Sequence, residues 1–551
     1  MMTDPPPHAA MRESRSAGFL SGMRQVCDLF LSLLIAVLLM RTFLLQGYLI
    51  STGSMAPHYY GQQKRAVCPE CEFTFAVGTE FDLDSHHEAG DWAICPNCYA
   101  AEIDLSERPV NRGDHLLVWK NACSFRDPKR WEVIVFRNPN DPLETYIKRV
   151  AGLPGESLAI RDGNVWIDGE IARKSLAEQR ALRVPLFDQS FLPSSDDTWE
   201  PRWTTDSPDS GWSPNGTTWR YEPSLGEEDW LTYRQTVRFG GHQETTVCLS
   251  TEIAATIAPA FAPPESTFPF TPEPRFPGVR WDRGCLIATG ALSPSTMEKL
   301  TDLSSSPSYR DALQTLFQES RQVTVSDFLA YNHEVPDHQP AVVHDFFLEA
   351  SIQPDQQTGT VMIELGSSAG PCQCHLDLTA ATATLHSGKE LENRHQAQLK
   401  MPLNQFVVEM SSFDDQILVA INGREIFRES LSRTAMKENS VERLSVARIS
   451  GTTPFEIGSL RLFRDIHYTG GSGMHGSEIP YQIPDGHYFV LGDNSRVSSD
   501  SRLWEQPTVP RKLLIGKPFL VHLPSTQKRI GWGKWQWTYR CPDFSRIRFV
   551  R

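Results

Sequence analysis

The chain has 551 residues, 40% of them hydrophobic, and a formal net charge of −14. The hydrophobic content is typical of folded domains and not of a disordered chain, and the length is enough for about three or four domains. The acidic balance argues against nucleic acid as a main partner. It does not exclude a membrane, because the charges are distributed unevenly along the chain.

An apolar run near the N-terminus predicts a transmembrane helix. Residues 29–40 contain no charge, and residues 22–43 supply the roughly 20 residues that a bilayer requires. The alternative is a cleaved signal peptide, but no convincing small-x-small cleavage site follows the run. By the positive-inside rule, three upstream arginines place residues 1–21 in the cytoplasm as a polar tail and the rest of the chain on the outer face. These arginines are Arg12, Arg15 and Arg24.

The first candidate catalytic residue follows this run. Residues 44–50 are expected to form a short strand, and the stretch 50–57, Ile-Ser-Thr-Gly-Ser-Met-Ala-Pro, places Ser54 in a tight bend. A serine hydroxyl needs an adjacent base to act as a nucleophile at neutral pH. No G-x-S-x-G elbow surrounds Ser54, so the sequence does not support an α/β-hydrolase.

Four cysteines form a second pattern between residues 62 and 105. Cys68-Pro-Glu-Cys71 and Cys95-Pro-Asn-Cys98 are two C-P-x-C knuckles separated by 23 residues. They are typical of a zinc ribbon, in which four thiolates surround one structural ion and leave no position for water. The alternative is two disulfides, which the predicted location outside the cytoplasm favours. The other cysteines show no framework spacing: Cys27, Cys123, Cys248, Cys285, Cys372, Cys374 and Cys541.

A candidate base lies in the stretch 146–156. Lys148 falls in a β-prone run that ends in a Pro-Gly turn. A lysine in an apolar site loses its proton readily, because desolvation disfavours the charged form. Since a serine with a neutral lysine is a known variant of the catalytic triad, Ser54 and Lys148 are the candidate nucleophile and general base.

Residues 173–478 are long enough to form a domain of their own. Their second half alternates apolar and polar residues, and Asn422-Gly423 is the signal of a type I′ hairpin turn. Many short alternating strands with such turns predict a β-sandwich, and one helix is expected near 309–319. The stretch 455–468 resembles the closing strands of concanavalin-like or laminin-G-like sandwiches. The Asp-Gly-Glu and Ile-Pro-Asp-Gly sequences at the two junctions predict a separable domain.

The first half of this region is rich in tryptophan. Exposed tryptophans can stack on sugar rings, so a carbohydrate is one candidate ligand of the inserted domain and a protein is another. The alternative is that the tryptophans belong to the core, since a fold does not by itself imply a function. They are Trp199, Trp203, Trp212, Trp219 and Trp230.

Four blocks of the sequence resemble, in order, those of the bacterial type I signal peptidases, the membrane-bound serine proteases that remove signal peptides from exported proteins. The four-cysteine pattern and the region 173–478 have no counterpart in that family's usual pattern. The blocks are residues 53–57, 112–118, 146–156 and 492–504.

The resemblance implies a mainly β catalytic domain made of residues 44–172 and 479–551, interrupted by the ribbon and the sandwich. It implies a single-pass protein of the cytoplasmic membrane that contacts lipid, cleaves signal peptides of exported pre-proteins and needs no cofactor for catalysis. The alternative is a membrane-anchored binding protein on a degenerate peptidase scaffold. The intact Ser54 and Lys148 argue against that alternative.

The resemblance also implies roles for individual residues. Ser54 would attack the scissile carbonyl, with Lys148 as general base. The backbone N–H of Ser54 and the hydroxyl of Thr52 would form the oxyanion hole. Ser498 would hydrogen-bond the lysine. The pair that would hold the site together is Asp500 and Arg502.

Overall fold

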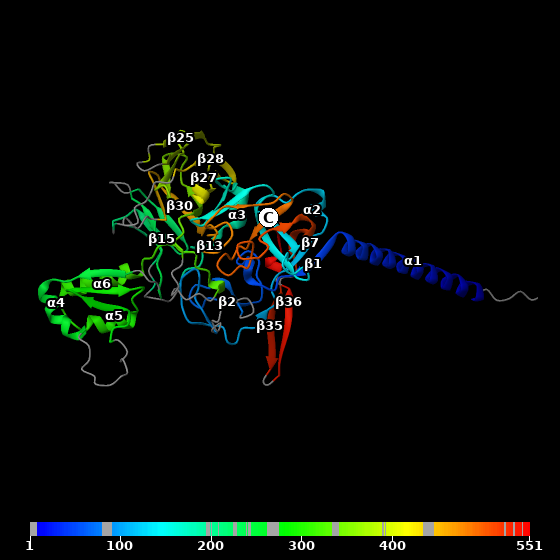
Figure 1. Ribbon diagram of the computed structural model, residues 1–551, viewed down its shortest axis with the longest axis horizontal. Coiled ribbons are helices and arrows are strands. Elements are labelled where there is room, and N and C mark those ends of the chain that lie inside the picture. Colours follow the sequence, from blue (N-terminus) through cyan, green and yellow to red (C-terminus); the bar gives the residue numbers. More distant parts are fainter. Residues whose placement is uncertain are drawn as a thin grey trace, which may run out of the picture.

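The computed structural model contains a long N-terminal helix, a β core built from both ends of the chain, a cysteine ribbon and a large insertion (Figure 1). The strands predominate, as the sequence predicts. The structure describes residues 8–79, 91–193, 199, 201–205, 207, 209–223, 229–238, 240, 244–261, 275–332, 341–387, 391, 393–432, 446–522, 525–532, 535–542 and 544–550.

The N-terminal helix is α1 (His8–Phe43), which projects away from the folded part (Figure 1). Its segment Met23–Phe43 is long and apolar enough to cross a membrane, and its side chains are exposed. The span expected at 22–43 is therefore helical. The helix already begins at His8, so it also includes part of the segment 1–21 that is predicted to be a cytoplasmic tail. These first turns contain several alanines and arginines, residue types that favour helix.

The β core contains an eight-stranded sheet in the order β1-β7-β34-β8-β9-β32-β33, with β37 paired to β34. All these pairings are antiparallel. The sheet places the late strand β32 directly beside β9, where Val490 pairs with Val150. The strands are β1 (Leu45–Leu49), β7 (His115–Trp119), β8 (Val133–Arg137), β9 (Thr145–Gly152), β32 (His487–Leu491), β33 (Val509–Pro510), β34 (Leu514–His522) and β37 (Arg548–Phe549).

Smaller elements complete the core. A four-stranded sheet has the order β12-β11-β10-β31, and a C-terminal hairpin of β35 and β36 extends from the body (Figure 1). The strands are β10 (Ser157–Arg161), β11 (Asn164–Ile167), β12 (Glu170–Ile171), β31 (Tyr481–Gln482), β35 (Ser525–Trp532) and β36 (Trp535–Pro542). The short helices are α2 (Ala122–Phe125), η6 (Arg511–Leu513) and η7 (Phe544–Arg546).

The ribbon consists of two small antiparallel sheets, β3-β2-β6 and β4-β5. Its four cysteines are buried with Phe75, Val77 and Leu105. The strands are β2 (Gln63–Val67), β3 (Thr74–Gly78), β4 (Trp92–Ala93), β5 (Ile103–Asp104) and β6 (Val110–Asn111).

The insertion forms the expected two-sheet sandwich, because side chains of both sheets share one core. The first sheet contains β13 (Val184–Asp188), β15 (Trp212–Asn215), β16 (Thr218–Tyr221), β21 (Phe346–Pro354), β26 (Phe406–Ser411), β27 (Gln416–Ile421), β28 (Arg424–Ser430) and β30 (Phe455–Arg464). The second contains β14 (Trp203–Thr205), β17 (Leu231–Tyr233), β22 (Thr360–Leu365), β23 (Cys372–Asp377), β24 (Thr382–Ser387), β25 (Asn393–Gln398) and β29 (Ala447–Gly451).

Two details of the sandwich bear on the sequence predictions. Asn422 and Gly423 join β27 to β28 with φ angles of 49° and 76°, so the predicted type I′ turn is confirmed. Four of the tryptophans are buried and are core residues, so they are not available to stack on a sugar. They are Trp203, Trp212, Trp219 and Trp230.

Residues 244–261 and 275–321 form a separate lobe with its own core, which the sequence predictions did not distinguish from the sandwich. The three-stranded sheet β18-β20-β19 packs against the expected helix α6 (Pro307–Arg321). Cys248 and Cys285 form a disulfide there, although their spacing gave no sign of it. The other elements are β18 (Glu244–Cys248), α4 (Thr251–Ile257), η3 (Ala258–Phe261), β19 (Val279–Asp282), β20 (Cys285–Thr289) and α5 (Pro294–Thr301).

A buried ion cluster joins the insertion to the β core just before α3 (Leu176–Leu182). The Lys174 amine lies 2.5 Å from Asp414 and 2.7 Å from Asp465, and 4.7 Å from the ring centre of Trp131. Burial alone would lower the pKa of Lys174, but the two carboxylates outweigh it and raise that pKa. We call Lys174, Asp414, Asp465 and the adjacent Asp345 the junction cluster.

Candidate active site

The turn that carries Ser54 is fixed by both ends of the chain. It is a short 3-10 helix, η1 (Gly53–Met55), that follows β1. The backbone N–H of Ile50 donates to the carbonyl of Asp114 at 3.0 Å, which extends the pairing of β1 with β7. The backbone N–H of Asn494, from the late chain, donates to the carbonyl of Ser54 at 3.0 Å. As a result Ser54 is held with only 9% of its surface exposed.

Lys148 lies in the middle of β9, between β8 and β32. It is 3% exposed, and its Nζ is 2.5 Å from the Oγ of Ser54. This separation is within the reach that proton transfer requires. The hydroxyl of Thr52 lies 3.5 Å from the same Oγ. The structure therefore brings together the expected nucleophile, the expected base and Thr52.

Ser498 lies beside this pair but in a different arrangement from the expected one. Its hydroxyl is buried and has no hydrogen-bond partner among the described residues, so the bond expected to Lys148 is not formed. The hydroxyl faces Gly492 instead. A Cβ added to Gly492 would overlap the Oγ of Ser498 and the carbonyl of Ser54. The glycine thus leaves the space in which Ser498 packs against the Ser54 turn.

Asp500 and Arg502 form the buried pair that the sequence predicts. The guanidinium donates two hydrogen bonds to the carboxylate, at 2.9 and 2.8 Å. Burial favours a raised pKa for Asp500, but Arg502 outweighs it and the pKa is lowered. The same carboxylate accepts the backbone N–H of Gly492 at 2.9 Å. The pair therefore fixes the loop that borders Ser54.

A second buried pair was missed by sequence reasoning. Arg149 donates to both carboxylate oxygens of Asp493, at 2.7 and 2.5 Å, and both side chains are buried. The Nδ1 of His58 lies 2.9 Å from the same carboxylate. Burial opposes the charge on Asp493, but Arg149 and His58 outweigh it and lower its pKa. The signal was present: Arg149 follows the base directly, and Asp493 stands in the Gly-Asp-Asn sequence.

The insertion also reaches the nucleophile turn, through η4 (Ala330–Asn332). The side-chain amides of Asn332 and Asn494 bond to each other in both directions, at 3.0 and 2.6 Å. Asn494 also donates to the carbonyl of Gly53 at 3.1 Å. Tyr331 packs so closely on Gly53 that an added Cβ would overlap its ring. No feature of residues 330–332 in the sequence indicated these contacts.

The four knuckle cysteines converge on one point. Their sulfurs all lie within 4.8 Å of one another, with Cys68 3.6 Å from Cys98 and Cys71 3.7 Å from Cys95. A tetrahedral zinc with bonds of about 2.3 Å requires sulfurs about 3.8 Å apart. All four cysteines are free, so the structure does not form the alternative disulfides. The donor set fits a metal ion.

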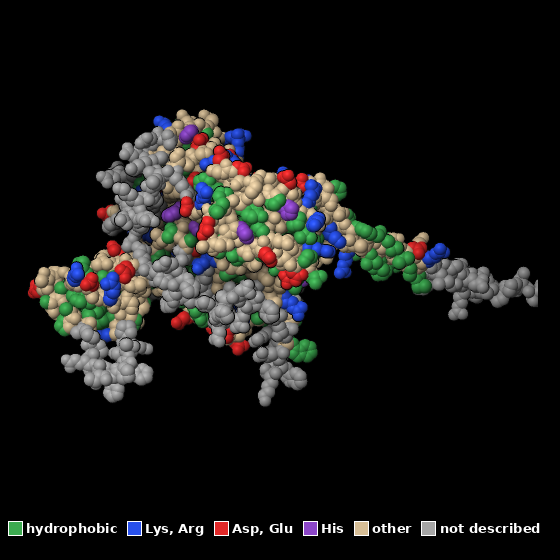
Figure 2. Space-filling model, viewed as in Figure 1, with side chains coloured by type: hydrophobic (Ala, Val, Ile, Leu, Met, Phe, Trp, Pro, Cys, Tyr) green, Lys and Arg blue, Asp and Glu red, His purple; other side chains and the backbone are tan. Residues whose placement is uncertain are grey.

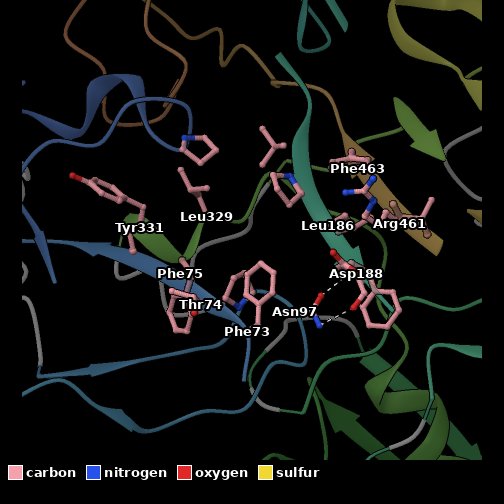
Figure 3. Close-up of a pocket in the computed structure, with 18 of the residues that line it drawn as sticks. Phe73, Thr74, Phe75, Asn97, Leu186, Asp188, Leu329, Tyr331, Arg461 and Phe463 are labelled. Carbon is pink, nitrogen blue, oxygen red and sulfur yellow. Dashed lines mark hydrogen bonds between the residues drawn. The ribbon is translucent and has the colours of Figure 1, made fainter. Parts of the chain in front are cut away.

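A cavity of about 250 Å³ lies where the ribbon, the insertion and the segment after Ser54 meet (Figure 3). Pro57 and Tyr60 line it from the nucleophile segment. Asn97, between the second pair of knuckle cysteines, accepts the backbone N–H of Asp188 at 2.7 Å and so docks the ribbon on the sandwich. The apolar lining comes chiefly from Phe73, Phe75, Leu186, Leu329, Tyr331 and Phe463.

Comparison with known proteins finds one matching family. The family described as signal peptidase, peptidase S26, matches residues 98–205 and 408–523. Over these residues the chain is similar to the signal peptidases. The matched residues include Lys148, Ser498, Asp500 and Arg502, but they do not include the Ser54 turn, and their boundaries run into the sandwich.

Curated relatives carry the signal peptidase name, but the chain spans less than half of their length. A probable signal peptidase I-2 of Synechocystis sp. is 34% identical over 16% of this chain and 42% of its own. Signal peptidase I of Pseudomonas aeruginosa is 29% identical over 27% of this chain and 38% of its own. Signal peptidase I of Pseudomonas fluorescens is 32% identical over 13% of this chain and 25% of its own.

Two solved structures resemble about a fifth of the chain. Galectin LEC-6 of Caenorhabditis elegans matches 22% of this chain and 83% of its own, with 12% identity and a TM-score of 0.18. The carbohydrate-binding module CBM66 of Bacillus subtilis matches 22% of this chain and 73% of its own, with 9% identity and a TM-score of 0.15.

Proposed function

We propose that the chain is a membrane-anchored serine endopeptidase that cleaves signal peptides from exported pre-proteins. The observation that carries the proposal is the 2.5 Å contact between Lys148 Nζ and Ser54 Oγ at a buried site. A buried lysine can act as a base, because desolvation favours its neutral form. The relationship to the signal peptidases supplies the substrate class.

In the proposed reaction, neutral Lys148 removes the proton of Ser54 as Oγ attacks the scissile carbonyl. The oxyanion that forms accepts hydrogen bonds from the backbone N–H of Ser54 and the hydroxyl of Thr52. Lys148 then gives its proton to the leaving amine as the peptide bond breaks. Water, deprotonated by the same amine, hydrolyses the acyl-enzyme and restores Ser54.

The test is cleavage of a pre-protein by the purified full chain in detergent. Ser54→Ala and Lys148→Ala should each abolish cleavage and leave the fold intact. Lys148→Arg should also fail, because a guanidinium does not lose its proton in proteins. The matched control is Lys129→Arg, which changes an exposed lysine away from the site. Substantial cleavage by a folded Lys148→Arg protein would refute the general-base role.

Lys120 directly follows β7 and is another lysine that could be considered as the base, but its contacts argue against this role. Its Nζ donates to the carbonyl of Thr42 in α1 at 3.1 Å, at the membrane end of the domain. Lys148 alone of the two contacts Ser54. We therefore assign the base to Lys148.

We also propose that Cys68, Cys71, Cys95 and Cys98 bind one structural zinc. Four thiolates fill a tetrahedral site, so no position remains for a reacting water. Elemental analysis should find one zinc per chain, and Cys68→Ser should lower that content and the stability of the ribbon. Absence of zinc, with linked cysteines found by mass spectrometry, would favour disulfides instead.

The proposed topology has the N-terminus in the cytoplasm and the folded part on the outer face of the membrane. The upstream arginines support it, and so does the Cys248–Cys285 disulfide, because disulfides persist in oxidising compartments. External protease should digest the folded part in spheroplasts, and the protein should stay in the membrane after a carbonate wash. Protection of the C-terminus would contradict this orientation.

A further inference from the structure

An open pocket lined by positively charged side chains lies next to the C-terminal end of α1. It has a volume of about 520 Å³ and is formed by α2, the segment before it and η6 with the start of β34. Figure 2 shows Lys and Arg side chains gathered where the apolar helix joins the folded part. The residues that line the pocket are Lys120, Cys123, Ser124, Arg511, Lys512 and Leu514.

Hydrogen bonds tie this pocket to the end of the apolar span. The Nζ of Lys120 donates to the carbonyl of Thr42 at 3.1 Å, and its backbone N–H donates to the carbonyl of Leu44 at 3.0 Å. The side chain of Asn121 donates to the carbonyl of Phe43 at 3.1 Å. The span ends at Phe43, so the pocket lies at the level where hydrocarbon gives way to lipid headgroups. This placement is the same for either orientation of the helix.

The charges of the pocket are only partly compensated. Arg511 pairs with Asp127 at 2.7 Å and donates to the carbonyl of Cys123 at 3.3 Å. Lys512 is exposed and has no ion-pair partner among the described residues. The ammonium group of Lys120 has three N–H donors, and one of them bonds to the Thr42 carbonyl. Three cations thus line one opening, and within the described part of the chain only Arg511 of the three pairs with a carboxylate. An anion with several acceptor oxygens would satisfy their remaining donors.

An exposed aromatic pair stands next to the pocket. Trp119 is 43% exposed and Phe125 is 75% exposed, and their ring centres are 6.0 Å apart. Trp119 belongs to β7 and pairs with Leu45, the second residue after the span. Aromatic side chains favour the zone between hydrocarbon and water. The aromatic pair can therefore enter the interface while the cations face the headgroups.

We propose that this pocket binds the phosphodiester of an anionic phospholipid, such as phosphatidylglycerol, in the leaflet next to the folded part. The phosphate oxygens accept hydrogen bonds from Lys120, Arg511 and Lys512. The acyl chains lie beside α1 and the aromatic pair. The site holds the β core at a fixed height and tilt on the membrane, and it does not depend on the proposed peptidase activity.

The test is native mass spectrometry of the full chain in a neutral detergent, titrated with phosphatidylglycerol or phosphatidylcholine. The site variant is K120Q/R511Q/K512Q. The matched control, K299Q/K400Q/R424Q, removes the same charge from exposed positions on the lobe and the sandwich. Each cation near a lipid surface contributes about fivefold in affinity. The site variant should therefore weaken phosphatidylglycerol binding at least tenfold, and the control should bind as the wild-type chain does.

Several outcomes would overturn the assignment. Equal weakening by both triple variants would mean that only net charge matters. Equal binding of phosphatidylcholine would mean that the pocket does not select an anionic lipid. Displacement of phosphatidylglycerol by the same concentration of inorganic phosphate would mean that the pocket recognises free phosphate. Unfolding curves of all three proteins, recorded in the same detergent, show whether each variant is folded.

Discussion

Replacing Gly53 with alanine should disable the site by steric overlap alone. Gly53 is not among the residues with a left-handed backbone, so alanine is compatible with its conformation. The added Cβ would overlap the ring of Tyr331. That ring cannot easily move, since Tyr331 is 3% exposed, stacks on Tyr60 at 5.7 Å and donates to the carbonyl of Gln62 at 3.1 Å. The turn before Ser54 must therefore shift.

The size of the effect follows from the two ways in which the turn can respond. Overpacking of this kind costs about 1–3 kcal/mol of unfolding free energy. A displacement of roughly 1 Å between reacting groups can cost about a hundredfold in rate. We expect Gly53→Ala to lower pre-protein cleavage about a hundredfold. Tyr331→Leu, which removes the far half of the ring, should restore much of that loss in the double variant.

The assay is pre-protein cleavage by purified full-length variants, with unfolding curves recorded in parallel. Gly47→Ala is the matched control, because an added Cβ there meets only His522, at an ordinary contact distance of 3.7 Å. Full activity of Gly53→Ala would refute the reasoning. A double variant no more active than Gly53→Ala alone would also refute it, since the overlap with Tyr331 would then not be the cause.

Three further changes test the contacts between the insertion and the β core. Asn332→Ala should lower cleavage about tenfold, because it removes the amide pair behind the Ser54 turn. It should leave the global unfolding free energy within about 1–2 kcal/mol of wild type. An unchanged kcat would contradict this role of Asn332. Lys174→Met should cost about 3–5 kcal/mol in a denaturant titration, because it leaves the carboxylates of the junction cluster without their cation. The pKa of Asp345 is raised by burial and by the nearby carboxylates of Asp465 and Asp414. The protonated side chain therefore contributes its full stabilisation below the pKa of the unfolded state, about 3.9, and this stabilisation is lost as pH rises through the pKa of the folded state. Asp345→Asn, which mimics the protonated acid, should therefore match wild type near pH 4 and exceed its stability at higher pH; parallel stability curves would count against it.

Most of the sequence predictions that the structure supports were based on short patterns of neighbouring residues. The Asn422-Gly423 turn depends on two backbone angles that these residue types favour, so a dipeptide was enough to predict it. The four cysteines share a spacing that only a common ion or disulfides would require. Ser54 and Lys148 lie 94 residues apart, and they were paired through their chemistry and the resemblance to a family, not through any local signal.

The features that the sequence did not reveal depend on packing between distant segments. In the sequence, Tyr331 and Asn332 carry no feature that separates them from other loop residues. Their contacts with the Ser54 turn depend on how the insertion packs against the β core. The Cys248–Cys285 disulfide joins β18 to β20, which are not consecutive strands, in a lobe that the sequence predictions did not separate from the sandwich. Ser498 was given a bond to Lys148 by analogy, whereas its hydroxyl faces Gly492 in this chain.

The order of these contacts along the chain determines when the site can assemble. Ser54 and Lys148 are both synthesised in the first third of the chain, yet the residues that hold them come last. Asp493 bonds to Arg149 across 344 residues, and Asn494 bonds to the turn at Gly53 across 441. Contacts between residues so far apart in the sequence form late, and they make folding slower. A nascent chain that ends before residue 493 contains the reactive pair without its supports, so synthesis must pass residue 494 before the site can work.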